Sequence, residues 1–112
     1  MKKVEATVRP DRLGVVVNAL TEAGFPNMTY YDAKGRGNIK GEKKIWRGQE
    51  YTVNIGRRIQ LILLIDDEDV DQVVDIIMRS ASTGETGDGT ICVTNIEELV
   101  KIRALEKRVE VL

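Results

Sequence analysis

Ser82-Thr83-Gly84-Glu85-Thr86-Gly87-Asp88-Gly89-Thr90 is the stretch around which the rest of the chain is organised. It places three glycines between an amphipathic helical pattern and a short β-branched segment. Glycine adopts positive φ angles at almost no steric cost, and it lets a ligand approach the main chain closely. Such a loop directs several backbone N–H groups inward and can form an anion-binding concavity. A Gly-Asp-Gly sequence is also an ordinary turn, so the loop alone leaves both interpretations open.

The segments on either side of this loop predict one helix and one strand. Apolar residues recur at helical spacing over 70–81, which predicts a helix with one apolar face. The residues of this stripe are Val70, Val73, Val74, Ile77 and Ala81. Asp69, with Gln72 three residues later, predicts a capping box at the start of the helix. After the loop, Ile91–Thr94 predicts a short strand.

The first part of the chain repeats the strand–helix pattern. Apolar residues alternate with polar ones over 4–8, which predicts a strand. Pro10 and Asp11 then open a helix that ends before Gly24, its expected C′ residue. The apolar stripe of this helix comprises Leu13, Val16, Val17, Leu20 and Ala23. Further strands are predicted over Met28–Lys34 and Ile59–Ile65, and the second of these is apolar enough to be buried on both faces.

This doubled pattern predicts a ferredoxin-like βαββαβ sandwich of the α+β class, as a single domain over residues 1–112. Both helices would cover the same face of the sheet. Because Ile59–Ile65 is apolar on both sides, the uncovered face is expected to be buried by other copies of the chain. The sequence therefore predicts a homo-oligomer.

Residues 35–55 contain several glycines among basic residues, and their apolar residues show no regular spacing. We expect a long loop here, and loops of about 20 residues in compact domains are usually functional or disordered. Exposed aromatic and arginine side chains are typical interface anchors, so the candidate partner contacts are Lys43, Lys44, Trp46 and Arg47. A solvated insertion without a binding role is the alternative. Residues 96–108 show mixed helical character and many charges.

Charge and composition narrow the functional class. The formal net charge is -1, which argues against general binding of nucleic acid. The chain contains no histidine, the commonest general base at neutral pH. Its single cysteine, Cys92, excludes an internal disulfide and fits a reducing compartment. No apolar run is long enough to span a bilayer, so we expect a cytoplasmic protein.

With these segments placed, the chain resembles the PII nitrogen-regulatory signalling family along nearly its whole length and without a gap. The matching residues are Arg9-Pro10, Leu13, Gly24, Met28-Thr29, Gly35, Gly37, Lys40-Gly41, Arg47-Gly48-Gln49-Glu50-Tyr51, Thr83-Gly84, Gly87-Asp88-Gly89 and Ile102-Arg103. In the terms of that family, the T-loop covers about 37–55, the B-loop about 82–90 and the C-terminal loop about 96–112.

The resemblance implies a compact homotrimer that is not an enzyme and that binds an adenine nucleotide (ADP, ATP or AMP) in the clefts between subunits. It also implies a T-loop that docks on a nitrogen-metabolism target, namely an ammonium transporter, glutamine synthetase or a nitrogenase component. Contacts to the nucleotide phosphates would come from Gly35, Gly37, Asn38, Gly87, Asp88 and Gly89. Thr29 and Leu64 would contact the base and ribose, while Lys101 and Arg103 would reach in from the neighbouring subunit.

Several positions depart from the family pattern. Ile39 replaces a glutamine that helps to hold magnesium and 2-oxoglutarate beside ATP, and isoleucine offers no oxygen ligand. Thr90 replaces a lysine, while Arg58 and Lys101 replace other cations with a changed geometry. We therefore expect a divergent member with a weak or absent 2-oxoglutarate response, no metal ligands of its own, and a preference for ADP or AMP.

Two alternatives stay open at this point. The altered residues are compatible with a constitutive trimeric interaction protein that has lost nucleotide sensing. An acylphosphatase-like enzyme would need a glycine-rich phosphate loop directly after the first strand, where this chain has no glycine over residues 8–11. Tyr51 occupies a position that is uridylylated in some bacterial members, and a purely structural tyrosine is the competing interpretation.

Overall fold

The computed structural model of the 112-residue chain describes residues 1–36, 42–53 and 55–103. Its strands and α-helices follow in the order β1 (Lys2–Val8), α1 (Leu13–Glu22), β2 (Thr29–Arg36), β3 (Glu42–Trp46), β4 (Gln49–Val53), β5 (Ile55–Ile65), α2 (Val70–Ala81) and β6 (Ile91–Asn95). A single 3₁₀ turn precedes each α-helix, η1 over Pro10–Arg12 and η2 over Asp67–Asp69.

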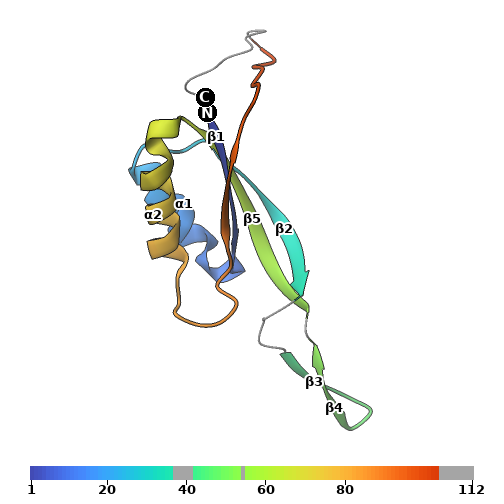
Figure 1. The fold of residues 1–112 in the computed structure, drawn as a ribbon. Coiled ribbons are helices and arrows are strands. Elements are labelled where there is room, and N and C mark those ends of the chain that lie inside the picture. The colour runs from blue at the N-terminus through green and yellow to red at the C-terminus, as the bar shows by residue number, and fades with distance from the viewer. Residues whose placement is uncertain (37–41, 54, 104–112) are drawn as a thin grey trace.

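Four of the strands form an antiparallel sheet in the order β2-β5-β1-β6. Both helices lie on one face of this sheet, and the opposite face is uncovered (Figure 1). This arrangement confirms the predicted ferredoxin-like α+β fold. Among the described residues, none of the helices is both long and apolar enough to cross a membrane.

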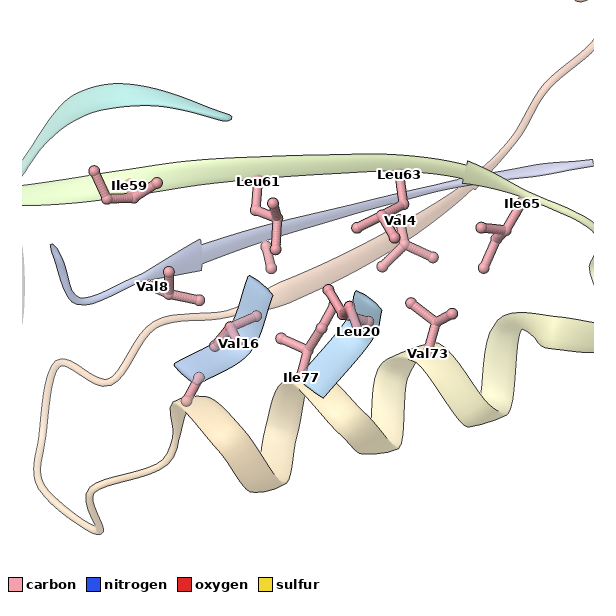
Figure 2. Close-up of a cluster of buried hydrophobic side chains, with 12 residues drawn as sticks. Val4, Val8, Val16, Leu20, Ile59, Leu61, Leu63, Ile65, Val73 and Ile77 are labelled. Carbon is pink, nitrogen blue, oxygen red and sulfur yellow. The ribbon is translucent and has the colours of Figure 1, made fainter. Parts of the chain in front are cut away.

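The core lies between the two helices and the sheet face that they cover (Figure 2). Successive strand residues point to opposite faces, so alternate positions of β1 and β5 fill this layer together with Val16, Leu20, Val73 and Ile77 of the helices. Each fully buried aliphatic side chain contributes about 1.5–3 kcal/mol. The two predicted helical stripes are confirmed, except that Ala23 is exposed just beyond the end of α1.

In the single chain, β5 is buried on one face only. Its odd-numbered residues from 59 to 65 are buried, whereas Gln60, Ile62 and Leu64 are half-buried on the uncovered side. No second layer of described residues covers this side in the single chain, so burial of this face by other copies of the chain stays a prediction. Here Gln60 Nε2 donates to Glu5 Oε2 at 2.5 Å, and Thr7 Oγ1 donates to Gln60 Oε1 at 2.7 Å.

The ends of the helices are only partly as predicted. Asp69 has a helical backbone (φ -93°, ψ -7°) and its side chain makes no capping hydrogen bond, so the predicted capping box is wrong. Side-chain N-caps need an extended cap residue, but the chain already turns through η2 before α2 begins. Gly24 follows α1 with a φ of 96°, as expected for a C′ glycine.

The segment expected to be a loop over 35–55 contains regular structure. β2 continues to Arg36, β5 begins at Ile55, and β3 pairs with β4 as a separate two-stranded hairpin. Arg47 and Gly48 form its turn with φ angles of 52° and 77°, and two positive φ angles are typical of a type I′ turn. The β3 sequence carries no apolar alternation, whereas Tyr51, Val53 and Ile55 alternate with polar residues, a strand signal that the loop prediction overlooked.

The segment after β6 also differs from expectation. Residues 96–103 contain no helix, although mixed helical character was predicted from 96 onwards. The remainder of that predicted segment lies outside the described residues.

Candidate functional site

The glycine loop, residues 82–90, connects the end of α2 with the start of β6 at one end of the sheet (Figure 1). Ser82 leaves the helix with an extended backbone (φ -68°, ψ 134°). Gly84, Gly87 and Gly89 then have φ angles of 82°, 92° and 112°. All three glycines therefore adopt backbone conformations that other residues rarely adopt, as the sequence predicted.

Gly89 brings the loop into direct contact with β1. A Cβ atom at this position would lie 1.7 Å from the carbonyl oxygen of Thr7. The backbone N–H of Thr7 donates to the carbonyl of Thr90 at 2.9 Å, directly beside this contact. The fold itself therefore requires glycine at position 89. Gly84 differs, because nothing lies within 4 Å of a Cβ atom built there.

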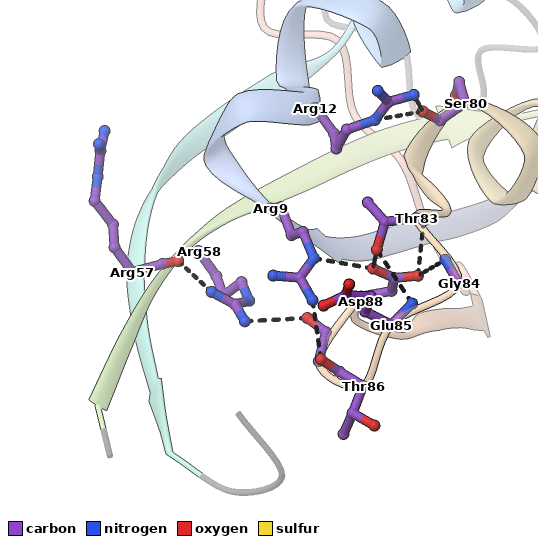
Figure 3. A network of polar contacts seen from close by, with 11 residues as sticks. Arg9, Arg12, Arg57, Arg58, Ser80, Thr83, Gly84, Glu85, Thr86 and Asp88 are labelled. Carbon is purple, nitrogen blue, oxygen red and sulfur yellow. Dashed lines mark hydrogen bonds and ion pairs between the residues drawn. The ribbon is translucent and has the colours of Figure 1, made fainter. Parts of the chain in front are cut away.

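The carboxylate of Asp88 holds the first half of the loop together (Figure 3). It accepts hydrogen bonds from the backbone N–H groups of Thr83 at 2.8 Å and Gly84 at 3.0 Å, and from the Thr83 hydroxyl. Arg9 Nε donates a further bond to it at 2.9 Å. The Thr83 hydroxyl and the Arg9 guanidinium hold the pKa of the Asp88 carboxyl well below its ordinary value, so the group is an anion at neutral pH.

Two guanidinium groups contact successive carbonyl groups of the same loop (Figure 3). Arg9 Nη2 donates to the carbonyl of Thr86 at 2.9 Å, and Arg58 Nη2 donates to that of Gly87 at 3.1 Å. Arg58 is only 8% exposed, and its Nη1 donates to the carbonyl of Arg57 at 2.7 Å. Within the described part of the chain, the acceptors of Arg58 are carbonyl groups and not carboxylates. A buried cation without an anionic partner is suited to binding an anion.

A cavity of about 440 Å³ lies behind the loop, between α2, β1 and β6. Apolar side chains line most of it, including Val74, Ile77, Met78 and Val93, and its described lining contains no lysine or arginine. Phosphate groups require cations or oriented N–H donors. The cationic surroundings of the glycine loop therefore suit a phosphate better than the lining of this cavity does.

Sequence reasoning missed the contacts that Arg9 and Thr83 make with the Asp88 carboxylate. Arg9 lies 79 positions from Asp88, so no local spacing rule connects the two residues. A usable signal existed in the topology, because antiparallel pairing of β1 with β6 places the residue that follows β1 beside the loop that precedes β6. Thr83 contacts Asp88 through a side-chain hydrogen bond within the loop, which no strand or helix pattern predicts.

The predicted nucleotide-binding residues form two groups in the single chain. The first group lies at the loop end of the sheet and consists of Arg58, the segment Gly87–Thr90 and Gly35, which pairs with Gly56. The second group lies further along β5. Leu64 is about 20 Å from Arg58 at the rise of a strand, and Thr29 pairs with Ile62, near Leu64.

Lys101 and Arg103 belong to this distant group as well. They follow β6 at the end of that strand away from the glycine loop (Figure 1). The structure therefore does not bring the two groups together in one chain. Gly37 and Asn38 lie outside the described residues.

The predicted partner contacts lie on the β3–β4 hairpin, which projects from the loop end of the sheet (Figure 1). Lys43, Lys44 and Trp46 belong to β3, and Arg47 is exposed at the turn. Tyr51 lies on β4, where its backbone pairs with Lys44.

Known proteins resemble this chain over its full length. Residues 1–106 match the family described as Nitrogen regulatory protein P-II. A Nitrogen regulatory protein P-II of Nostoc punctiforme is 44% identical over 110 residues, covering 98% of each chain. One from Bradyrhizobium diazoefficiens is 40% identical over 112 residues, covering 100% of both chains. The Nitrogen regulatory protein P-II 2 of Methanothermobacter thermautotrophicus is 40% identical over 106 residues, covering 95% of this chain and 92% of that protein.

Proposed function

The chain belongs to the nitrogen regulatory protein P-II family, and from this premise we propose that it binds an adenine nucleotide between the subunits of a homotrimer. Proteins of this family transmit regulatory signals in nitrogen metabolism and are not enzymes. The nucleotide controls how the protein engages a target through the T-loop.

The observation that carries this proposal is the glycine loop together with the two arginines that hold it. Gly87 and Gly89 hold the backbone in conformations with positive φ, and the buried Arg58 guanidinium lies against the Gly87 carbonyl. A polyphosphate brings several negative charges, which such a combination of backbone donors and a poorly hydrated cation can stabilise. Thr90 supplies a hydroxyl where the family usually has a lysine, so we expect ADP or AMP to bind in preference to ATP.

The separation of the candidate residues supports a site shared between copies. Leu64 lies about 20 Å along the strand from Arg58, and Lys101 and Arg103 follow the far end of β6. A nucleotide held by Arg58 of one copy would meet these residues on a neighbouring copy. The half-buried apolar side chains of Ile62 and Leu64 on the uncovered sheet face offer a surface for that assembly.

Target control is assigned to the β3–β4 hairpin, which carries Lys43, Lys44, Trp46 and Arg47. The hairpin pairs only within itself among the described strands. It is therefore able to change its orientation without disturbing the four-stranded sheet. We propose a cytoplasmic protein whose target is an ammonium transporter, glutamine synthetase or a nitrogenase component. Tyr51 on β4 is the candidate position for covalent modification.

The side-chain chemistry at position 39 argues against a strong response to 2-oxoglutarate. Magnesium prefers a near-ideal octahedron of oxygen ligands, and the isoleucine at this position provides none. The residues of this chain therefore do not fit a fully coordinated magnesium ion beside ATP, although Arg58 could pair with a carboxylate of the effector.

Calorimetric titration with ADP, AMP and ATP tests the proposal, each with and without 2-oxoglutarate at saturating magnesium. We expect one nucleotide per chain and a change in ATP affinity of less than about tenfold when 2-oxoglutarate is added, which is a coupling below about 1.4 kcal/mol. Ile39→Gln should increase this coupling, and Ile39→Leu is the matched control because it restores no oxygen ligand.

A wild-type protein that binds none of the three nucleotides would contradict the proposal and favour a constitutive trimeric interaction protein. Strong coupling in the wild type would contradict the argument about position 39 while leaving nucleotide binding intact.

A further inference from the structure

The glycine loop carries an anion of its own. Two consecutive backbone N–H groups, those of Thr83 and Gly84, point at the same carboxylate oxygen of Asp88. The Thr83 hydroxyl and Arg9 Nε donate to the other oxygen. This is the donor set expected around a bound phosphate or carboxylate ligand, but here a side chain of the loop occupies it.

The same contacts fix the second half of the loop. Arg9 bridges the Asp88 carboxylate and the Thr86 carbonyl, and Arg58 holds the Gly87 carbonyl. In a planar trans peptide, each carbonyl points away from the N–H group of the next residue. Because the carbonyls of Thr86 and Gly87 face the two guanidinium groups, the N–H groups of Gly87 and Asp88 are directed to the opposite side.

We infer that Asp88, Arg9 and Thr83 are positioning residues of the proposed nucleotide site. The Asp88 carboxylate serves as an internal anion that sets the loop in its phosphate-binding shape without itself contacting the nucleotide. This inference rests on the proposed function and adds the contacts that order the site. Asp88 thus acts through Gly87 and Gly89, and its charge is balanced by Arg9 rather than left to repel a phosphate.

The physical benefit is preorganisation. A loop with three glycines loses more backbone entropy on ordering than a loop of the same length with fewer glycines. If the internal contacts order it in advance, the nucleotide does not have to supply that free energy on binding. Loss of one contact should therefore weaken nucleotide affinity even though no group that touches the nucleotide has changed.

Thr83 offers the cleanest test, because its hydroxyl donates to Asp88 and accepts from the N–H of Glu85 at 3.3 Å. Thr83→Val removes both contacts at nearly constant volume, and Thr83→Ser retains them. We expect ADP affinity, measured by calorimetry, to fall about tenfold in Thr83→Val and to stay within about threefold in Thr83→Ser. Thr86→Val is the matched control in the same loop, because Thr86 takes part in the network through its backbone carbonyl, which this substitution keeps.

A second measurement reads the network without any nucleotide. In the wild type, the Gly84 amide resonance should not titrate as the pH falls to 3.8, the ordinary carboxyl value. In Arg9→Gln the Gly84 amide resonance should titrate at a higher pH than in the wild type, because Arg9 is the cation that faces Asp88 directly. The other charged groups nearby are Arg58, which faces the adjacent Gly87, and Glu85, which is exposed in the same loop. A role limited to global stability would lower the melting temperature without moving this titration.

The outcomes separate the two proposals. If the wild type binds ADP and Thr83→Val binds it equally well, the positioning role is wrong and the nucleotide site stands. If Arg9→Gln leaves the Gly84 titration unchanged, the internal-anion role of Asp88 is wrong. If the wild type binds no nucleotide, the proposed function fails and this inference falls with it.

Discussion

Gly89→Ala should destabilise the protein far more than Gly84→Ala, although both substitutions change a glycine with positive φ in the same loop. The φ angles are 112° and 82°, so each alanine introduces backbone strain of about 1–2 kcal/mol. At position 89 the new Cβ would also lie 1.7 Å from the Thr7 carbonyl oxygen. That separation is far inside the roughly 3.5 Å optimum for non-bonded atoms, so the loop must withdraw from β1.

Withdrawal of the loop adds two further penalties at position 89. Overpacking typically costs about 1–3 kcal/mol, and the Thr7–Thr90 backbone hydrogen bond contributes about 0.5–1.5 kcal/mol. The expected loss is about 2.5–6.5 kcal/mol for Gly89→Ala, against about 1–2 kcal/mol for Gly84→Ala. Guanidinium unfolding at equal protein concentration measures both values, since the stability of an oligomer depends on concentration. Equal losses in the two variants would refute the close approach of the loop to β1.

Three further predictions concern charge, core and hairpin. The pKa of Asp88 is lowered on folding, so the contribution of this group to stability is present above the ordinary value of 3.8 and is lost as the pH falls towards the folded value. In thermal melts the stability advantage of the wild type over Asp88→Asn should therefore narrow below pH 3.8. An advantage that widens below this pH would contradict the sign of the pKa shift. Leu20→Ala should cost about 2–5 kcal/mol in denaturant unfolding because Leu20 is fully buried, and a loss below about 1 kcal/mol would argue against this core. Replacing residues 42–53 with a short glycine linker should leave the melting temperature nearly unchanged, because β3 and β4 pair only with each other among the described strands, and a collapsed sheet would show the hairpin to be structural.

The parts of the fold that sequence could predict are those with a regular apolar period. Val4, Ala6 and Val8 alternate, and Val73 and Ile77 recur at helical spacing, because each set faces one core layer. The β3–β4 hairpin pairs about a turn at Arg47 and Gly48. Ile45 and Trp46 are adjacent in β3, so that strand shows no alternation, and the alternation of Tyr51 with Val53 in β4 is too short to have outweighed the glycines and charges around it.

The candidate site was predictable only as far as local sequence determines it. Positive φ at Gly87 and Gly89 follows from the residue type in a short glycine-rich run. The contact between Arg9 and Asp88 depends on how β1 and β6 pair, which no local pattern reports. The capping role predicted for Asp69 failed for the same kind of reason, because η2 already turns the chain before α2 begins.

The central claim is that the phosphates of an adenine nucleotide bind at the backbone N–H groups of the glycine loop. Titration of the isotopically labelled protein with ADP, followed through its backbone amide resonances, tests this most directly. The account predicts saturable shifts at Gly87, Asp88 and Gly89 and at the Nε of Arg58, with Val74 and Met78 in the apolar cavity nearly unaffected. Saturable binding that leaves the loop resonances unchanged, or that shifts the cavity residues instead, would contradict it.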